Sequence, residues 1–237
     1  MNSSAEMADQ KFEADYIKLG RLISTMGRKT LRNLESAVYG LLKRDPDLCR
    51  TAIRDDDEID LVEKEIDAIA IEILAQHQAS GDSLRQVVSS MKVAASLERI
   101  SDHAVNIAKR GKKMLTRNEL SETQYIEPLY TLADGVLRDA LASYVDSDAD
   151  LGSSLRKRDK EIDRMHKELI GRLMGFIEQG GDQSIAYLHL IFVIRSLERV
   201  GDLAVNIGED AVFLDRAEDI RYAKHATKKT AEDKATL

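Results

Sequence analysis

SLERISDHAVNI, the stretch Ser96–Ile107, returns 100 residues later as SLERVGDLAVNI at Ser196–Ile207. A match of this length at such a separation indicates that the chain is built twice from one structural unit. The residues that both copies share are rich in chemistry: Glu98 and Glu198, Arg99 and Arg199, Asp102 and Asp202, and Asn106 and Asn206. The repeat therefore gives both the architecture and the first candidates for function.

The repeat extends toward the N-terminus of each unit. Residues 45–60 share acids and apolar positions with residues 148–163 at a separation of 103. The separation then falls to 100 where Gly81-Asp82 matches Gly181-Asp182. Glycine favours turns, so the three-residue difference between the copies belongs in the turn before the last helix of each unit.

Apolar residues recur with helical spacing along the chain, and no stretch alternates with a period of two for long enough to suggest a sheet. We predict an all-α fold of two tandem, homologous three-helix bundles with long antiparallel helices. The six helices are expected over about 10–44, 46–78, 82–116, 123–147, 149–179 and 182–214. The predicted domains are residues 1–116 and 117–215, followed by a polar tail over 216–237 that we expect to be disordered. No connection is rich in Pro, Gly or Ser, so the bundles should pack together.

Composition narrows the function classes. The net charge is −7 with acids and bases interspersed, which disfavours a nucleic-acid binder that neutralises phosphates. The longest apolar run, Ile185–Ile194, contains His189 and is about half the length of a membrane span. The lone cysteine, Cys49, fits a reducing compartment, and no signal-peptide pattern is present. We expect a cytoplasmic protein with no direct membrane insertion.

Each unit carries two acid pairs at i, i+4 on helices that follow one another. They are Asp56/Asp60 with Glu98/Asp102, and Asp159/Asp163 with Glu198/Asp202. Like charges at this spacing destabilise a helix by about 0.2–0.5 kcal/mol per pair, and a bound cation would remove that penalty. Oxygen-only ligands suit magnesium, calcium, manganese or iron. The Glu98 row lies away from the apolar stripe of Leu97, which predicts sites at the surface of each bundle.

The same residues also have simpler explanations that involve no metal. Acid pairs on helices commonly just face solvent, Arg99 and Arg199 could screen them, and Asn106 and Asn206 could act as ligands or as hydrogen-bonding groups. His103 is matched by Leu203, which favours an ordinary surface histidine. Walker, GxGxxG and nucleophile-elbow motifs are missing, and neither glutamate is followed by the histidine of a di-iron bundle, so no catalytic residue is predicted.

At these residues the chain resembles the PhoU family of bacterial phosphate-transport regulators. The family motif, close to E-R-[IV]-G-D-H-A-x-N-I, appears at Glu98–Ile107 and at Glu198–Ile207. The acidic segment Asp56–Asp60 and the segment Asn206–Leu214 match as well, whereas Ser101 replaces the usual glycine and Leu203 the usual histidine. The resemblance implies two three-helix bundles that hold multinuclear metal clusters on the eight carboxylates named above, the ion being Fe, Mg, Mn or Zn.

The resemblance further implies a non-enzymatic adaptor in phosphate homeostasis. It would link the ATPase subunit of a phosphate ABC transporter to a phosphate-sensing histidine kinase and repress phosphate-starvation genes. Arg99 and Arg199 are then candidate partner-binding residues, and the internal duplication favours a homodimer. Two alternatives stay open: a metal-dependent hydrolase or redox enzyme that uses the same carboxylates, and a metal-free helical scaffold.

Overall fold

The computed structural model describes residues 2–76 and 79–221, with side chains from residue 10 onward. Over these residues the chain forms six α-helices, one short 3₁₀ helix and no strand. The elements are α1 (Asn2–Leu42), α2 (Pro46–Gln76), α3 (Gly81–Leu115), η1 (Ser121–Tyr125), α4 (Ile126–Val145), α5 (Ala149–Glu178) and α6 (Ser184–Arg216). The predicted all-α fold is confirmed. From residue 222 on, the predicted polar tail lies outside the described residues.

Two helix starts differ from the prediction by more than two residues. Helix α1 begins at Asn2, whereas the apolar pattern places its start near residue 10. No glycine or proline occurs before Gln10, so nothing interrupts the helix even where its apolar stripe fades. Helix α4 begins at Ile126, because η1 occupies part of the connection between the two units.

The same turn occurs at the same place in both units. Asp45 caps α2, where its Oδ1 accepts hydrogen bonds from the backbone N–H groups of Asp47 at 2.8 Å and Leu48 at 3.1 Å. Asp148 caps α5 through a 2.9 Å bond from the N–H of Leu151. The residues just before these caps, Arg44 and Ser147, both have a left-handed φ of 53°. The duplication read from the sequence is therefore present in the backbone and in the capping chemistry.

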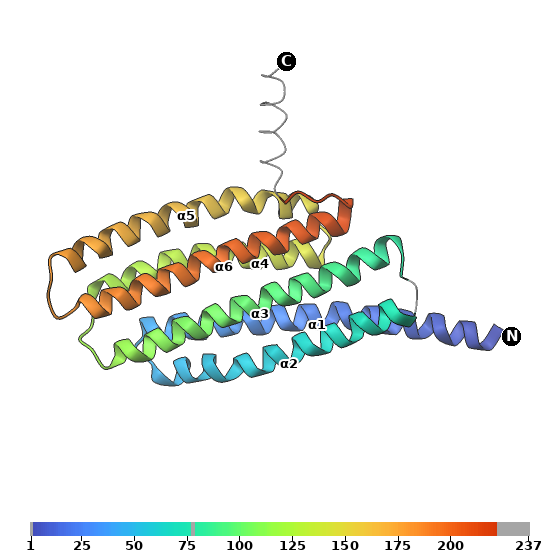
Figure 1. Cartoon of the computed structure of the whole chain (residues 1–237), viewed down its shortest axis with the longest axis horizontal. Helices are drawn as coiled ribbons and strands as arrows, with labels where there is room; N and C mark the ends of the chain where they lie inside the picture. The colour runs from blue at the N-terminus through green and yellow to red at the C-terminus, as the bar shows by residue number, and fades with distance from the viewer. Residues whose placement is uncertain (1, 77–78, 222–237) are drawn as a thin grey trace, which may run out of the picture.

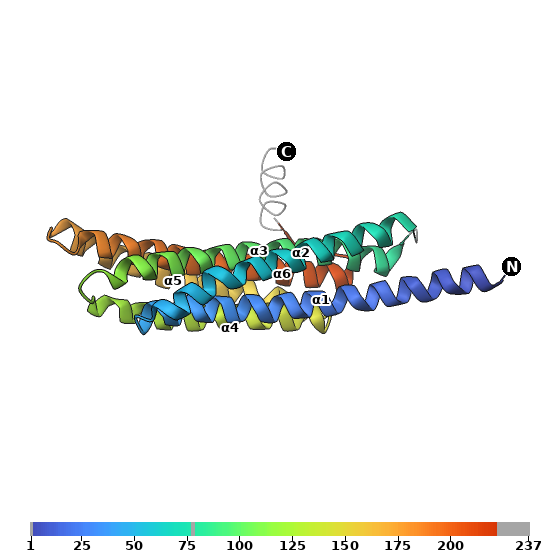
Figure 2. The same cartoon turned by 90° about the horizontal axis from the view of Figure 1, so that it is seen from below.

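The six helices form two three-helix bundles that lie side by side (Figures 1 and 2). Helices α1, α2 and α3 pack on one another, as do α4, α5 and α6. The bundles meet mainly along α3 and α6, which run antiparallel at the middle of the molecule, and also where α1 contacts α4. One layer of the molecule thus consists of α5, α6, α3 and α2. Helices α4 and α1 cover one face of this layer (Figure 2).

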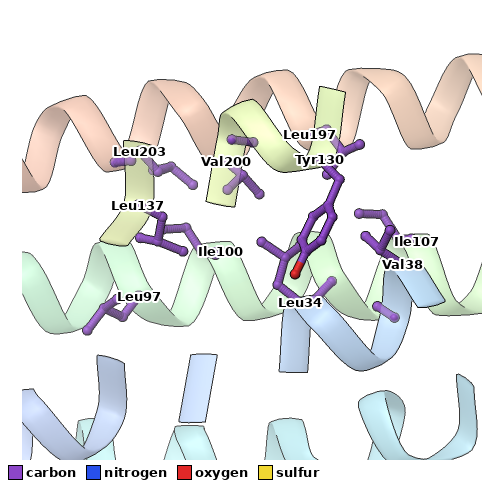
Figure 3. Close-up of a cluster of buried hydrophobic side chains, with 14 of the residues drawn as sticks. Leu34, Val38, Leu97, Ile100, Ile107, Tyr130, Leu137, Leu197, Val200 and Leu203 are labelled. Atoms are coloured by element: carbon purple, nitrogen blue, oxygen red, sulfur yellow. The ribbon is translucent and has the colours of Figure 1, made fainter. Parts of the chain in front are cut away.

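One hydrophobic core runs through both bundles. Figure 3 shows Leu97, Ile100 and Ile107 of α3 together with Leu197, Val200 and Leu203 of α6, between side chains of α4 and α1. All of these α3 and α6 residues are at most 4% exposed. The expected packing of one bundle on the other is confirmed. None of the helices in the described ranges combines the length and apolarity needed to cross a bilayer.

Candidate functional site

The first acid patch lies along the contact between α2 and α3. Asp56 and Asp60 come from α2, and Glu98 and Asp102 come from α3. Asp102 is exposed and the other three are half-buried, so the row lies at the edge of the bundle as predicted. Burial raises the pKa of Glu98 to about 6, and the charge of Asp102 and of the remaining acids adds to the rise. The patch therefore gathers negative charge that the protein does not neutralise.

In the first patch, Ser101 stabilises the charged form of Asp56 by a hydrogen bond. Its hydroxyl donates a 2.6 Å hydrogen bond to Oδ1 of Asp56 and accepts a 3.0 Å bond from the side-chain amide of Asn33. Burial raises the pKa of Asp56 above its ordinary value, and the bond from Ser101 works against that rise. A buried hydrogen-bonded chain thus links α1, α3 and α2 behind the patch.

The second acid patch lies between α5 and α6. It consists of Asp159 and Asp163 with Glu198 and Asp202, all half-buried. Oδ1 of Asp159 is buried and has no hydrogen-bond partner. Burial, followed by the charges of Asp202, Asp163 and Glu198, raises the pKa of Asp159 to about 7.

The two patches differ because Gly201 stands where the first unit has Ser101. A Cβ atom on Gly201 would lie 2.8 Å from Oδ1 of Asp159 and 2.8 Å from Cδ1 of Ile162. The glycine therefore makes room for the Asp159 carboxylate to approach α6, and it offers no hydroxyl to satisfy it. A buried carboxylate oxygen without a donor is costly.

The side chains of both acid patches are of the kind that bind cations. Each patch offers carboxylate oxygens, the ligands of hard ions, and the unpartnered Oδ1 of Asp159 is available to one. Among residues 2–76 and 79–221, however, no three His, Cys, Asp or Glu side chains already converge on one ion-sized position. The carboxylates would turn toward one another to ligate an ion, which their half-exposed positions allow.

The two candidate partner-binding arginines have different surroundings. Arg199 is paired with the acids of its own patch, at 2.9 Å from Asp202 and 3.4 Å from Glu198. Arg99 is exposed and makes no ion pair within the described chain. The candidate supporting amides, Asn106 and Asn206, are exposed and make no side-chain hydrogen bond there either. Arg199 thus screens its neighbours, whereas Arg99 is free to meet something else.

Sequence reasoning missed three residues. Glu63 adds to the negative charge that raises the pKa of Glu98, and its counterpart in the second unit is His166, whose Nε2 is buried without a partner. The sequence could have indicated both residues. Each lies seven residues after an acid of its patch, Asp56 or Asp159, which is about two turns along the same helix face. The third is His103, which is not the expected surface histidine. It is half-buried beside α6, its Nδ1 has no partner, and burial lowers its pKa.

The PhoU domain model matches this chain twice, over residues 23–111 and 126–211, which are the two bundles. The chain belongs to the PhoU family. It is 33% identical over 216 residues to the phosphate-specific transport system accessory protein PhoU homolog of Pseudomonas putida, which covers 90% of this chain and 84% of that protein. The homologue of the same name from Pseudomonas aeruginosa is 31% identical and covers 90% of this chain and 88% of its own.

Solved structures agree. The crystal structure of PhoU from Pseudomonas aeruginosa matches with a TM-score of 0.81 at 30% identity, and covers 87% of this chain and all of that one. The phosphate transport system regulatory protein PhoU from Streptococcus pneumoniae matches with a TM-score of 0.81 at 25% identity, over 88% of this chain and 99% of that one. The resemblance inferred from the repeated motif and the two-bundle fold are both confirmed.

Proposed function

We propose that this protein is a cytoplasmic, non-enzymatic adaptor that represses the phosphate-starvation response when phosphate is plentiful. Its partners would be the ATPase subunit of the phosphate transporter and the phosphate-sensing histidine kinase, which a homodimer could engage together. The observation that supports this most directly is a match to a PhoU accessory protein over 90% of this chain and 84% of that protein. Both copies of the carboxylate motif are present in this chain. Phosphate transport accessory function is the part that the relatives' names state.

The adaptor role is tested by deletion. Cells that lack the protein should express a starvation-promoter reporter in phosphate-rich medium, because the kinase loses its repressing input. A complementing copy with Arg99→Glu should restore repression only in part, since Arg99 has no ion pair of its own and can meet a partner's carboxylate. Normal repression in the deletion strain would contradict the proposal.

Arg199→Glu supplies the comparison for Arg99. Arg199 is engaged by Asp202 and Glu198, so its reversal places a fifth acid in the second patch as well as removing a surface cation. A defect shared by both variants supports a partner surface that includes both arginines. A defect confined to Arg199→Glu would mean that Arg199 acts by neutralising the acids of the second patch.

We further propose that each acid patch binds metal ions, of Fe, Mg, Mn or Zn. Asp56, Asp60, Glu98 and Asp102 would hold the first, and Asp159, Asp163, Glu198 and Asp202 the second. The ion would supply the positive charge that the patches lack. Support comes from the carboxylate-only donor set and from the unpartnered oxygen of Asp159.

Removing one patch should remove one site. The variant with Glu98→Ala and Asp102→Ala is expected to lose the metal of the first patch and to keep that of the second, because the patches lie on different helix pairs. Elemental analysis of purified protein measures the metal per chain, and the matched variant with Glu198→Ala and Asp202→Ala should show the reverse. An unchanged metal content in both variants would refute the assignment.

The enzyme alternative rests on Asp159, because a carboxyl group with a pKa of about 7 has the value that general acid–base catalysis favours. Metal-loaded protein can be assayed for phosphatase and oxidase turnover. Turnover that disappears in Asp159→Asn would bring this alternative forward. A lack of turnover would count against the enzyme alternative, and a lack of bound metal would favour the metal-free helical scaffold.

A further inference from the structure

A basic groove runs between α3 and α6 on the side that α1 and α4 do not cover. It has a volume of about 470 Å³, and its lining includes Arg99, His103, Asn106 and Arg110 of α3 with Arg195 and Arg199 of α6. No Asp or Glu lines it. In a chain with a net charge of −7, four arginines on one acid-free groove are a local reversal of sign.

The protein does little to neutralise these arginines. Arg99 and Arg195 are exposed and make no ion pair within residues 2–76 and 79–221. Arg110 lies over the ring of Phe192, with 4.2 Å between its guanidinium carbon and the ring centroid, and approaches Nδ1 of His189 at 3.4 Å. Only Arg199 has carboxylate partners. Three guanidinium groups therefore face the groove without a counter-charge.

The opposite end of the same helix pair shows that this charge is not needed for packing. Because α3 and α6 are copies that run antiparallel, the counterparts of Arg110 and Phe192 are Asp210 and Lys92. These two residues form an ion pair at the opposite end. The hollow at that end, of about 390 Å³, is lined by acids as well as arginines, among them Asp159, Asp202 and Glu209. The position equivalent to Arg195 is Ala95. The two ends thus share one backbone arrangement, and only one of them is basic.

We propose that this groove binds an anion that carries two or more phosphoryl groups. Planar guanidinium groups bind phosphate oxygens through paired, charge-assisted hydrogen bonds. Arg99 and Arg110 are eleven residues apart on one helix, about 16 Å along its axis, so the basic lining is longer than a single phosphate and can contact several phosphoryl groups of one ligand. A groove of about 470 Å³ is of the size that holds small organic ligands.

The flanking charge favours a compact anion over an acidic peptide. The first acid patch lies on one side of the groove, along α2 and α3, and the second lies on the other, along α5 and α6. An acidic peptide that crossed the groove would meet one of these patches and be repelled. A polyphosphate anion can stay within the groove. The inference goes beyond the adaptor role and does not depend on it.

The test is equilibrium binding of defined probes to the full chain. Protein is stripped of metal on a chelating resin so that no probe binds through an ion in the acid patches. Tripolyphosphate, ATP and inorganic phosphate are then titrated calorimetrically at constant ionic strength. Tripolyphosphate or ATP should bind, and inorganic phosphate should bind far more weakly. The preferred probe distinguishes an inorganic chain from a nucleotide.

The groove variant is Arg99→Ala with Arg195→Ala. Both arginines are exposed and unpaired, so the fold should persist, which circular dichroism and thermal melting check. Two charged hydrogen-bond donors are lost, so the affinity should fall by at least about tenfold. The matched control is Arg32→Ala with Arg164→Ala, two exposed arginines outside the groove, and it should bind as the wild type does.

Three results would overturn the proposal. The first is no binding of tripolyphosphate or ATP to the wild type. The second is an equal loss of affinity in the control variant, which would mean a general charge effect. The third is binding of a polyglutamate peptide as tight as that of tripolyphosphate, which would make the groove a docking surface for carboxylates. The first two outcomes leave the starvation reporter unaffected, and the third would support the role of Arg99 in binding a partner's carboxylate, so the two proposals fail separately.

Discussion

Asp159 shows how a single neighbouring residue changes the chemistry of a carboxylate. Its counterpart Asp56 receives a hydrogen bond from Ser101, whereas Asp159 faces Gly201 and receives none. Partial burial raises the pKa of both carboxyls, and that of Asp159 reaches about 7. The two acid patches are thus equivalent in sequence and unequal in their demand for a positive charge.

This inequality predicts how stability changes with pH in metal-free protein. The pKa of Asp159 is raised to about 7 from an ordinary 3.8, so the folded state holds a proton that the unfolded state has released. The contribution of protonated Asp159 to the free energy of unfolding is therefore fully present below about pH 4. It is lost as pH rises through about 7. Glu98, with a pKa of about 6, acts in the same direction. Thermal melting between about pH 5 and pH 8 should show the midpoint falling as pH rises.

Asp159→Asn is the decisive variant, because it removes the titrating group and keeps the shape. Its midpoint should depend less on pH near 7. Gly201→Ser should act in the same direction by supplying a donor like Ser101, provided that the ends of the Asp159 and Ile162 side chains move aside. A pH dependence in Asp159→Asn equal to that of the wild type would mean that other groups carry it.

At the scale of elements, α5 and α6 pack closely through two glycines. Gly152 and Gly208 face each other, and a Cβ on Gly152 would lie 2.5 Å from the carbonyl oxygen of Gly208. That oxygen belongs to the backbone, so it cannot turn away as a side chain could. Elsewhere on α5 the glycines have open space, since a Cβ on Gly171 would meet nothing within 4 Å.

Two alanine substitutions on one helix should therefore have opposite effects. Gly152→Ala should lower the free energy of unfolding by about 1–3 kcal/mol, because overpacking exceeds the gain in helix propensity. Gly171→Ala should raise it by about 0.4–1 kcal/mol, because the unfolded chain loses freedom at no steric cost. Denaturant unfolding measures both. Stabilisation by Gly152→Ala would show that the two helices can separate without penalty.

At the scale of the whole molecule, the two bundles share their core. Leu97 and Ile100 of α3 and Val200 of α6 are fully buried, and the same cluster includes residues of α1 and α4 (Figure 3). If the bundles separated, the apolar stripes of α3 and α6 would be exposed to water, at a cost of about 25 cal/mol for each Å². The repeat thus describes how the chain is built, and the shared core predicts that the two bundles fold together.

The whole protein should accordingly unfold in one cooperative transition. Hydrogen exchange at the buried residues of α2 and of α5 should give the same opening free energy, and far-UV circular dichroism should show one denaturation midpoint. The first bundle alone, residues 1–120, should lack a cooperative transition because its α3 stripe is exposed. Two resolved transitions in the full chain would show that the bundles fold separately.

Much of the site followed from residues that repeat. The i, i+4 acids on consecutive helices, the caps at Asp45 and Asp148, and the turn glycines Gly81 and Gly181 all carry local signals, because helix geometry fixes which neighbours share a face. The eight carboxylates do fall on adjacent helix pairs. Their role as metal ligands stays a prediction, as do the domain boundaries at 116 and 215.

The sequence by itself determined the helices, their duplication and the family. Each of these rests on patterns that can be read along the chain, either as spacing within one segment or as a match between two segments. Only the tertiary structure decided that α3 runs along α6, and with it the burial of His103 and the meeting of Arg99 and Arg110 with Arg195. It also decided that Arg199 forms ion pairs with the acids of its own patch, whereas Arg99 forms none within the described residues. These facts depend on contacts between residues about a hundred positions apart. Such contacts are set by how two apolar stripes pack, which no local pattern specifies.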